Sequence, residues 1–177
     1  MTLTDKERRP LILRSNRFFG SALIERQLIS TDDLEAANEK LLELVQSGEM
    51  RSANLLNLLL FDLKAIDENA LIELVTDEQP VGMIDLAHYD MAKFRELRAD
   101  IEICYATYTI PFDKVEDFTM VATAYYLSKP TVQYWEELLG GNVIWYVSSV
   151  ASIVEAIERA AQIASTEELV TTEEKKG

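Results

Sequence analysis

The feature that most constrains the fold is an apolar pattern that occurs twice, at an offset of 37 positions. In both copies the apolar residues follow the i, i+4, i+5 spacing of one helix face. The corresponding pairs are Phe19 and Leu56, Leu23 and Leu60, Ile24 and Phe61, Ile29 and Ile66, Leu34 and Leu71, and Ala37 and Leu74. Two such helix-turn-helix units can cover each other's apolar faces. The repeat therefore predicts an amino-terminal helical bundle of two helix-hairpin repeats.

Each predicted repeat contains a residue that is suited to start its second helix. Ser30 forms a Ser-x-x-Asp sequence with Asp33, a variant of the capping box that also places negative charge at the positive end of the helix dipole. Asp67 holds the equivalent position, and its side chain can likewise accept a hydrogen bond from the free amides of a first turn. The bundle is expected to end at residues 79–82, because Gln-Pro-Val-Gly is strong turn punctuation.

Beyond this point the pattern changes from helical to strand-like. Segments rich in β-branched and aromatic residues predict strands at residues 103–112, 118–126 and 142–147. The charged residues between the first two strands predict a turn, so that these strands pair as an antiparallel hairpin. Helical patterns cover residues 90–98, 129–139 and 149–164. The fold class is therefore α+β, with a helical bundle followed by a small ββαβα subdomain that has an about three-stranded sheet.

These patterns divide the chain into four parts. Residues 1–15 are predicted to be a flexible arm, since the first dozen lack hydrophobic periodicity, and residues 16–80 form the helical repeat subdomain. Residues 81–165 form the small α/β subdomain, in which Cys104 is expected to pack as a small apolar group of the first strand. Residues 166–177 are polar and acidic, and they are predicted to be a disordered tail.

The charge of the chain is strongly acidic and unevenly distributed. The net charge is −14; residues 1–20 carry five basic and two acidic residues, a balance of +3, so residues 21–177 carry −17. A body this acidic repels nucleic acid and anionic lipid, which leaves a protein with a basic surface as the expected partner. The alternative is that the charge serves solubility alone.

The sequence also bears on location and chemistry. With no signal-peptide pattern, no apolar stretch of transmembrane length and a single cysteine, we expect a cytoplasmic protein without a disulfide that does not insert into a membrane. His88 and Cys104 are the only residues of their kinds, and neither has a partner at metal-ligand spacing. Without a nucleophile motif such as G-x-S-x-G, we expect no enzyme activity, no metal and no cofactor.

Several segments, taken in order, are similar to one known domain family. They comprise residues 71–79, residues 81–86 ending in Ile-Asp-Leu, residues 121–124, the helix that ends in Leu-Gly-Gly at 139–141, and residues 143–147 and 153–159. This order resembles the amino-terminal domain of bacterial type II secretion and type IV pilus assembly ATPases, the MshEN-like domain, over residues 16–163. The chain has no G-x-x-x-x-G-K-[ST] phosphate loop, so it cannot hydrolyse ATP as those ATPases do.

The resemblance implies a function and an alternative to it. In the full ATPases the domain docks the motor to a membrane-anchored platform protein, which implies an adaptor that binds a secretion or pilus component. Some members bind cyclic-di-GMP through the two repeats, which implies a second-messenger sensor as the alternative. The candidate ligand residues are Arg17, Gly20 and Arg51, although the arginine stands one position early and the second repeat lacks both the arginine and the glycine. A degenerate, purely structural repeat remains the other interpretation.

The candidate partner-binding residues are aromatic. Tyr126, Trp135 and Trp145 belong to the predicted sheet and its crossover helix, and aromatic residues are enriched in interface hot spots. Neighbouring strand residues point to opposite faces of a sheet, so an aromatic that faces solvent would mark a docking surface. The alternative is that helices cover both faces of the sheet and bury these side chains.

Overall fold

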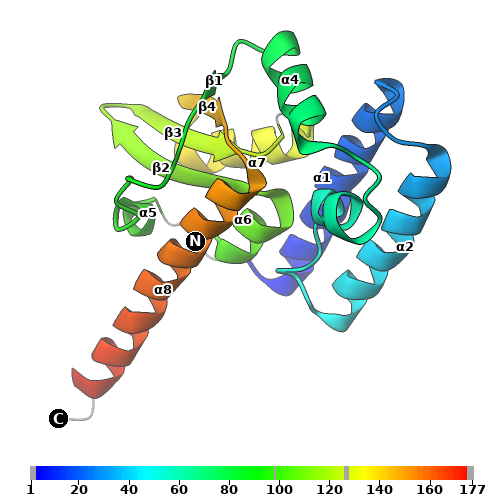
Figure 1. Ribbon diagram of the computed structural model, residues 1–177. Helices are drawn as coiled ribbons and strands as arrows, with labels where there is room; N and C mark the ends of the chain where they lie inside the picture. The colour runs from blue at the N-terminus through cyan, green and yellow to red at the C-terminus, as the bar shows by residue number, and fades with distance from the viewer. Residues whose placement is uncertain (1–2, 98, 126–127, 175–177) are drawn as a thin grey trace.

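The computed structural model describes residues 3–97, 99–125 and 128–174, with the side chains of residues 95 and 164–174 left out. The fold is α+β, as predicted, with the helical part on one side and a four-stranded mixed sheet on the other (Figure 1). The helical part contains α1 (Asp5–Glu25), α2 (Thr31–Ser47), α3 (Leu55–Asn57), the π-helical turn η1 (Leu58–Asp62) and α4 (Glu68–Glu78). The second part contains β1 (Gly82–Met83), α5 (Lys93–Glu96), α6 (Ile101–Thr107), β2 (Thr109–Val115), β3 (Phe118–Thr123), α7 (Lys129–Leu139), β4 (Val143–Val147) and α8 (Val150–Glu174).

Both predicted helix caps are confirmed. The hydroxyl of Ser30 accepts a hydrogen bond of 3.1 Å from the amide of Asp33 at the start of α2. The carboxylate of Asp67 accepts one of 3.0 Å from the amide of Ala70 at the start of α4. Gln27 and Lys64, which are also 37 positions apart, both have left-handed backbone conformations, with φ of 58° and 52°. The two units differ in length, because the first begins with the long helix α1 and the second with α3 and η1.

The amino terminus differs from the prediction, because residues 5–15 belong to α1 instead of an irregular arm. The Glu7 carboxylate accepts a hydrogen bond of 2.8 Å from the amide of Thr4 at the helix start. Asp100, which is buried, accepts hydrogen bonds from the Arg8 guanidinium at 3.0 Å and from the amide of Leu3 at 3.1 Å. Apolar periodicity is absent here, whereas polar contacts to Asp100, far away in the sequence, hold this end of the helix.

The sheet has the strand order β1-β4-β3-β2. The predicted antiparallel hairpin is confirmed as β2 and β3, whereas β3, β4 and β1 run parallel. The predicted number of about three strands was low by one, because the two-residue strand β1 pairs with the outer side of β4. A strand this short carries no alternation that a sequence pattern could show.

The predicted first strand was wrong over residues 103–107, which form most of α6. The carboxylate of Asp100 caps this helix by accepting a hydrogen bond of 3.0 Å from the amide of Glu102. Cys104 is buried, as predicted, but in this helix instead of a strand. A short apolar run does not by itself distinguish a buried strand from a buried helix. Here the run contains the end of helix α6 and the beginning of strand β2.

The remaining helices follow the prediction to different extents. Helix α7 has the predicted bounds and ends at Gly140, whose φ is 89°. Of the helix predicted at residues 90–98, only α5 is present, and residue 98 lies outside the described residues. Helix α8 begins as predicted but continues through Glu174, where a disordered tail was expected. In Figure 1 its last turns extend beyond the rest of the molecule. Among the described residues, no helix is apolar over a length that would cross a bilayer.

The sheet lies between two helical layers. On one face the indole nitrogen of Trp135 in α7 donates a hydrogen bond of 2.7 Å to the Thr109 hydroxyl of β2. On the other face, which α5 and α8 contact, Phe112 meets the rings of Tyr89 and Tyr146 edge to face. Helix α1 joins the helical part to this core, because the Ser128 hydroxyl donates a hydrogen bond of 2.9 Å to the Ser15 carbonyl.

Candidate functional site

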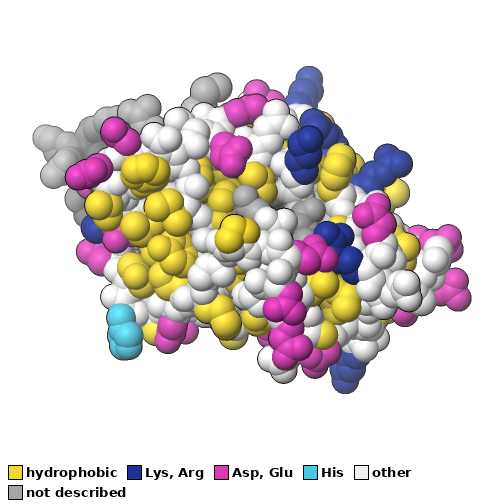
Figure 2. Space-filling model, turned by 90° about the horizontal axis from the view of Figure 1, so that it is seen from above, with side chains coloured by type: hydrophobic (Ala, Val, Ile, Leu, Met, Phe, Trp, Pro, Cys, Tyr) yellow, Lys and Arg dark blue, Asp and Glu magenta, His cyan; other side chains and the backbone are white. Residues whose placement is uncertain are grey.

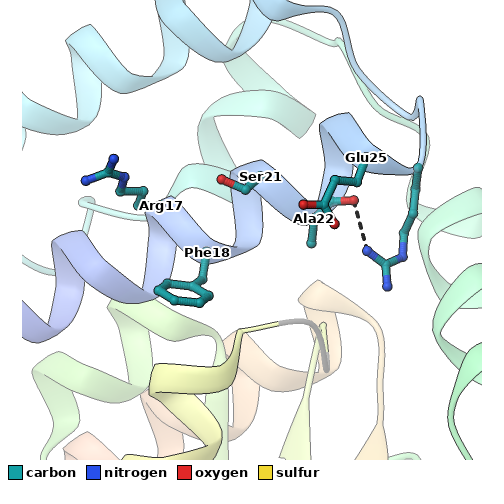
Figure 3. A pocket seen from close by; sticks show the side chains of 6 residues that line it. Arg17, Phe18, Ser21, Ala22 and Glu25 are labelled. Carbon is teal, nitrogen blue, oxygen red and sulfur yellow. Dashed lines mark hydrogen bonds between the residues drawn. The ribbon is translucent and has the colours of Figure 1, made fainter.

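The candidate ligand residue Arg17 lies beside an open groove on α1. The groove has a volume of about 570 Å³ and is lined by Arg17, Phe18, Ser21, Ala22, Glu25 and Arg26. Figure 3 shows that these side chains all come from one side of α1 or from the residue that follows it. Arg17 and Phe18 are exposed, so a cation and an aromatic ring are both open to solvent here. A predicted ligand residue therefore borders a groove at this place.

Arg26, at the end of the same groove, is already paired. Its guanidinium donates hydrogen bonds of 2.9 Å and 2.6 Å to the carboxylate of Glu78 in α4 and one of 3.1 Å to the carbonyl of Ala22. The hydrogen bond from Arg26 holds the pKa of Glu78 below its ordinary value. This ion pair joins the end of α1 to the end of α4, so the charge of Arg26 is already engaged within the protein.

Gly20 has a packing reason to be glycine. A β-carbon at this position would lie 2.6 Å from Cδ1 of Leu34 in α2 and 3.0 Å from Cδ2 of Leu55 in α3. The glycine is buried, and it allows α1 to approach both of these helices. Gly20 therefore faces the core of the bundle. The prediction instead gave it the role of letting a ligand approach the backbone closely.

Arg51 is engaged away from the groove on α1. Its guanidinium donates a hydrogen bond of 3.0 Å to the carboxylate of Glu102 and lies 5.4 Å from the centre of the Tyr105 ring. Neither Arg51 nor Gly20 lines the groove beside Arg17. The three candidate ligand residues therefore do not form one site in this structure.

The tryptophans proposed as partner anchors are buried. Trp135 is closed off from solvent between α7 and the sheet, and Trp145 is nearly so. Trp145 is on the α7 face, because its cross-strand partner Val121 lies on the same side of β3 as Thr123, the partner of Thr109. Both indoles belong to the core, which is the alternative arrangement in which helices cover these side chains. Tyr126 lies outside the described residues.

The exposed apolar residues of the sheet lie elsewhere, on the face opposite to α7. Val115, Phe118 and Ile144 expose 52%, 47% and 38% of their surface, and the half-buried Met120 lies among them. Strand register places the four on one face, because Val115 pairs with Phe118 and Met120 pairs with Ile144. We call these four residues the outer patch. Figure 2 shows hydrophobic side chains gathered on the half of the molecule that carries the sheet.

Acidic residues border the outer patch. Glu116 and Asp117 form the exposed turn between Val115 and Phe118. Asp113, paired with Met120, accepts a hydrogen bond of 2.6 Å from the ammonium group of Lys93 in α5. The hydrogen bond from Lys93 holds the pKa of Asp113 below its ordinary value, so both partners are charged at neutral pH. Since this lysine is neutralised, the turn gives the border a negative charge.

Sequence reasoning missed the outer patch, although part of its signal was present. Phe118 and Met120 alternate with Thr119 and Val121, which assigns the two sets to opposite faces of a strand. That alternation does not show which face a helix covers. The prediction favoured the face that carries Trp145, which is the face that α7 covers.

The remaining chemistry of the described residues points to packing. No group of three or more His, Cys, Asp or Glu side chains comes together there in the manner of a metal site. Burial raises the pKa of the Cys104 thiol well above its ordinary value, which disfavours the reactive thiolate. Burial likewise raises the pKa of Tyr125, whose ring is stacked on that of Phe19 with 3.8 Å between their centres.

Comparison with known proteins gives matches at the level of structure. No family model matches this sequence, and no curated protein matches it. The solved N-terminal domain of XpsE has 17% sequence identity and a TM-score of 0.50, over 78% of this chain and 91% of that chain. A structure of MshE with cdg has 17% identity and a TM-score of 0.47, over 80% of this chain and 96% of that one. The chain therefore has the fold of the XpsE N-terminal domain, which confirms, for the fold, the resemblance to secretion and pilus ATPase amino-terminal domains.

Proposed function

We propose that this chain is a non-catalytic docking domain that acts as an adaptor for a protein partner in the cytoplasm. The observation that carries the proposal is the outer patch, where four neighbouring apolar side chains of one sheet face are exposed or half-buried among the described residues. Single exposed apolar residues are ordinary on protein surfaces, but a contiguous group marks an interaction site. The shared fold with the XpsE N-terminal domain is in keeping with a partner in a secretion or pilus system.

The charge of the chain supports a partner with a basic surface. With a net charge of −14, the chain should associate with such a partner by electrostatic steering. Raising the salt concentration shortens the Debye length to about 8 Å at physiological ionic strength and less above it, so association should slow as salt rises. The duplicated helical units then serve as the scaffold that supports the sheet.

The test is the size of the species that contains the chain in an extract of its native cytoplasm. The 20.1 kDa chain should elute from a sizing column within a larger complex, and chemical crosslinking should join it to a second protein. Elution at the mass of the free chain, with no crosslinked partner at low salt, would contradict the docking function.

A second candidate function is the sensing of cyclic-di-GMP through the helical units. The groove on α1 favours it, because Arg17 can pair with a phosphate and the neighbouring Phe18 can stack on a base. The separate engagement of Arg51 by Glu102 counts against it. We expect no heat of binding when cyclic-di-GMP is titrated into the protein. Micromolar binding that is lost in Arg17→Ala but kept in Arg51→Ala would move the function to this groove.

A further inference from the structure

We propose that the outer patch receives an amphipathic helix from a different protein, with an apolar face of leucine or isoleucine flanked by lysine or arginine. This inference rests on the proposed docking function and specifies the chemistry of the partner. The four residues of the outer patch form two cross-strand pairs, and together these pairs span the adjacent strands β2, β3 and β4. They therefore form a flat apolar area across the sheet.

A helix fits this area better than an added strand does. Strand addition needs a free edge, and at the β2 edge Pro111 lacks an amide hydrogen and the register shifts between Pro111 and Asp113. Lys93 of α5 also binds Asp113 at that edge. The opposite edge is β1, which is only two residues long. Neither edge offers a long row of regular hydrogen-bonding groups.

The structure already shows how a helix covers this face. Helix α8 contacts β2, α5 and α6 and contributes Ile153, Ala156 and Ile157, all fully buried. The same face is covered near Phe112 and Tyr146 and open at the end that carries Phe118 and Ile144. A helix laid over the open end would extend the helical layer that α8 and α5 begin.

Charge selects the partner. Glu116 and Asp117 border the patch, and Asp113 beside it is neutralised by Lys93. A second copy of this chain would bring its own Glu116 and Asp117 and its net charge of −14 to the same contact, which disfavours self-association through this face. A partner helix with basic residues on either side of its apolar face would pair with the turn while covering the patch.

The test uses designed peptides of about 18 residues, a length that spans about five helical turns. The first peptide has leucines on one face and lysines on both sides of that face. The second carries glutamates in place of the lysines, and the third has the composition of the first in an order without amphipathic spacing. Each is titrated into the ¹⁵N-labelled full chain, and amide shifts are followed. We expect the first peptide alone to bind, with the largest shifts at residues 113–120 and 143–146.

Variants decide whether the outer patch carries the binding. The double variant Phe118→Thr and Ile144→Thr should lower the affinity by about tenfold or more, since both changes remove apolar contact at the centre of the site. The control double variant Leu42→Thr and Phe61→Thr removes similarly exposed apolar side chains from the helical part, and it should change the affinity less than about twofold. Equal losses in both, equal binding of the glutamate peptide, or shifts centred on other residues would overturn the inference.

Self-association is a separate outcome. If the free chain proves dimeric by light scattering and Phe118→Thr makes it monomeric, the patch belongs to a second copy and the inference fails. Failure of the inference is distinguishable from failure of the docking function. If the native complex persists in the Phe118 and Ile144 double variant, the chain docks through another surface. If the wild-type chain forms no complex at all, the docking function itself is wrong.

Discussion

The two faces of the sheet reverse what hydrophobicity alone would predict. On the α7 face Thr109, Thr119 and Thr123 are buried, whereas on the opposite face the larger apolar side chains of Phe118 and Ile144 are exposed. The buried threonines are tolerated because hydrogen bonds satisfy hydroxyl groups such as that of Thr109, which accepts from Trp135. The difference teaches that the position of the covering helices, more than residue type, decides which side chains of this sheet meet solvent.

The largest expected effect is on the covered face. Trp135→Ala should lower the free energy of unfolding by about 3–5 kcal/mol, because it leaves a cavity between α7 and the sheet and removes the hydrogen bond from the indole to Thr109. Urea unfolding followed by circular dichroism would measure it. A loss of less than about 1 kcal/mol in the free energy of unfolding would contradict the contrast between the two faces, since the α7 face would then be loosely packed.

The second effect is a loss of stability at alkaline pH. Burial raises the pKa of Tyr108 from 10.0 to about 12 and also raises the pKa of Tyr134 in α7. The protonated rings therefore contribute their full stability below about pH 10, and that contribution is lost as the pH rises through 12, because the unfolded chain releases these protons first. At about 1.4 kcal/mol for each tenfold change, Tyr108 alone accounts for about 3 kcal/mol.

Unfolding free energies measured at intervals from about pH 8 to 12 would show this loss, with tyrosinate absorbance rising together with the loss of structure. Tyr108→Phe is the control, since it should flatten the alkaline part of the profile. Tyrosinate absorbance that rises near pH 10 for every tyrosine, with the fold intact, would show that these rings are open to water.

The third effect concerns the Thr109 hydroxyl on the covered face. Thr109→Val keeps the shape of the side chain but leaves the indole nitrogen of Trp135 without an acceptor and removes the hydrogen bond between the hydroxyls of Thr109 and Thr107, which together should cost about 2 kcal/mol. Thr119→Val is the matched control, because Thr119 is buried on the same face and its hydroxyl is not the acceptor of the Trp135 indole. Equal costs for the two variants would mean that the bond to Trp135 contributes nothing specific.

The smallest effect is expected on the open face. Phe118→Thr keeps strand propensity and removes a side chain that is half in solvent, so the free energy of unfolding should change by less than about 0.5 kcal/mol. Thermal unfolding of the purified chain would measure it. A loss comparable to that of Trp135→Ala would show that the outer patch serves the fold instead of a partner.

The sequence predicted the parts of the fold in which a local pattern has one interpretation. The caps Ser30 and Asp67 and the bounds of α7 were predicted correctly, because side chains and turns next to them decide where those helices begin and end. The candidate site was predicted less well. Arg17 does lie at a groove, but Arg51 binds Glu102, which is 51 residues away, and Trp135 is buried. Contacts between distant segments do not appear in local spacing.

The sequence by itself determined the α+β class, the helix caps Ser30 and Asp67 and the alternation that separates Phe118 from Thr119 on the sheet. Only the tertiary structure decided that residues 5–15 are helical, held by Asp100, and that α7 covers the face of Thr119 while the face of Phe118 stays partly open. The physical reason is that backbone and capping energies depend on neighbours in the chain. Burial depends on which segments meet after folding, and a surface that no segment covers is visible only once all of them are in place.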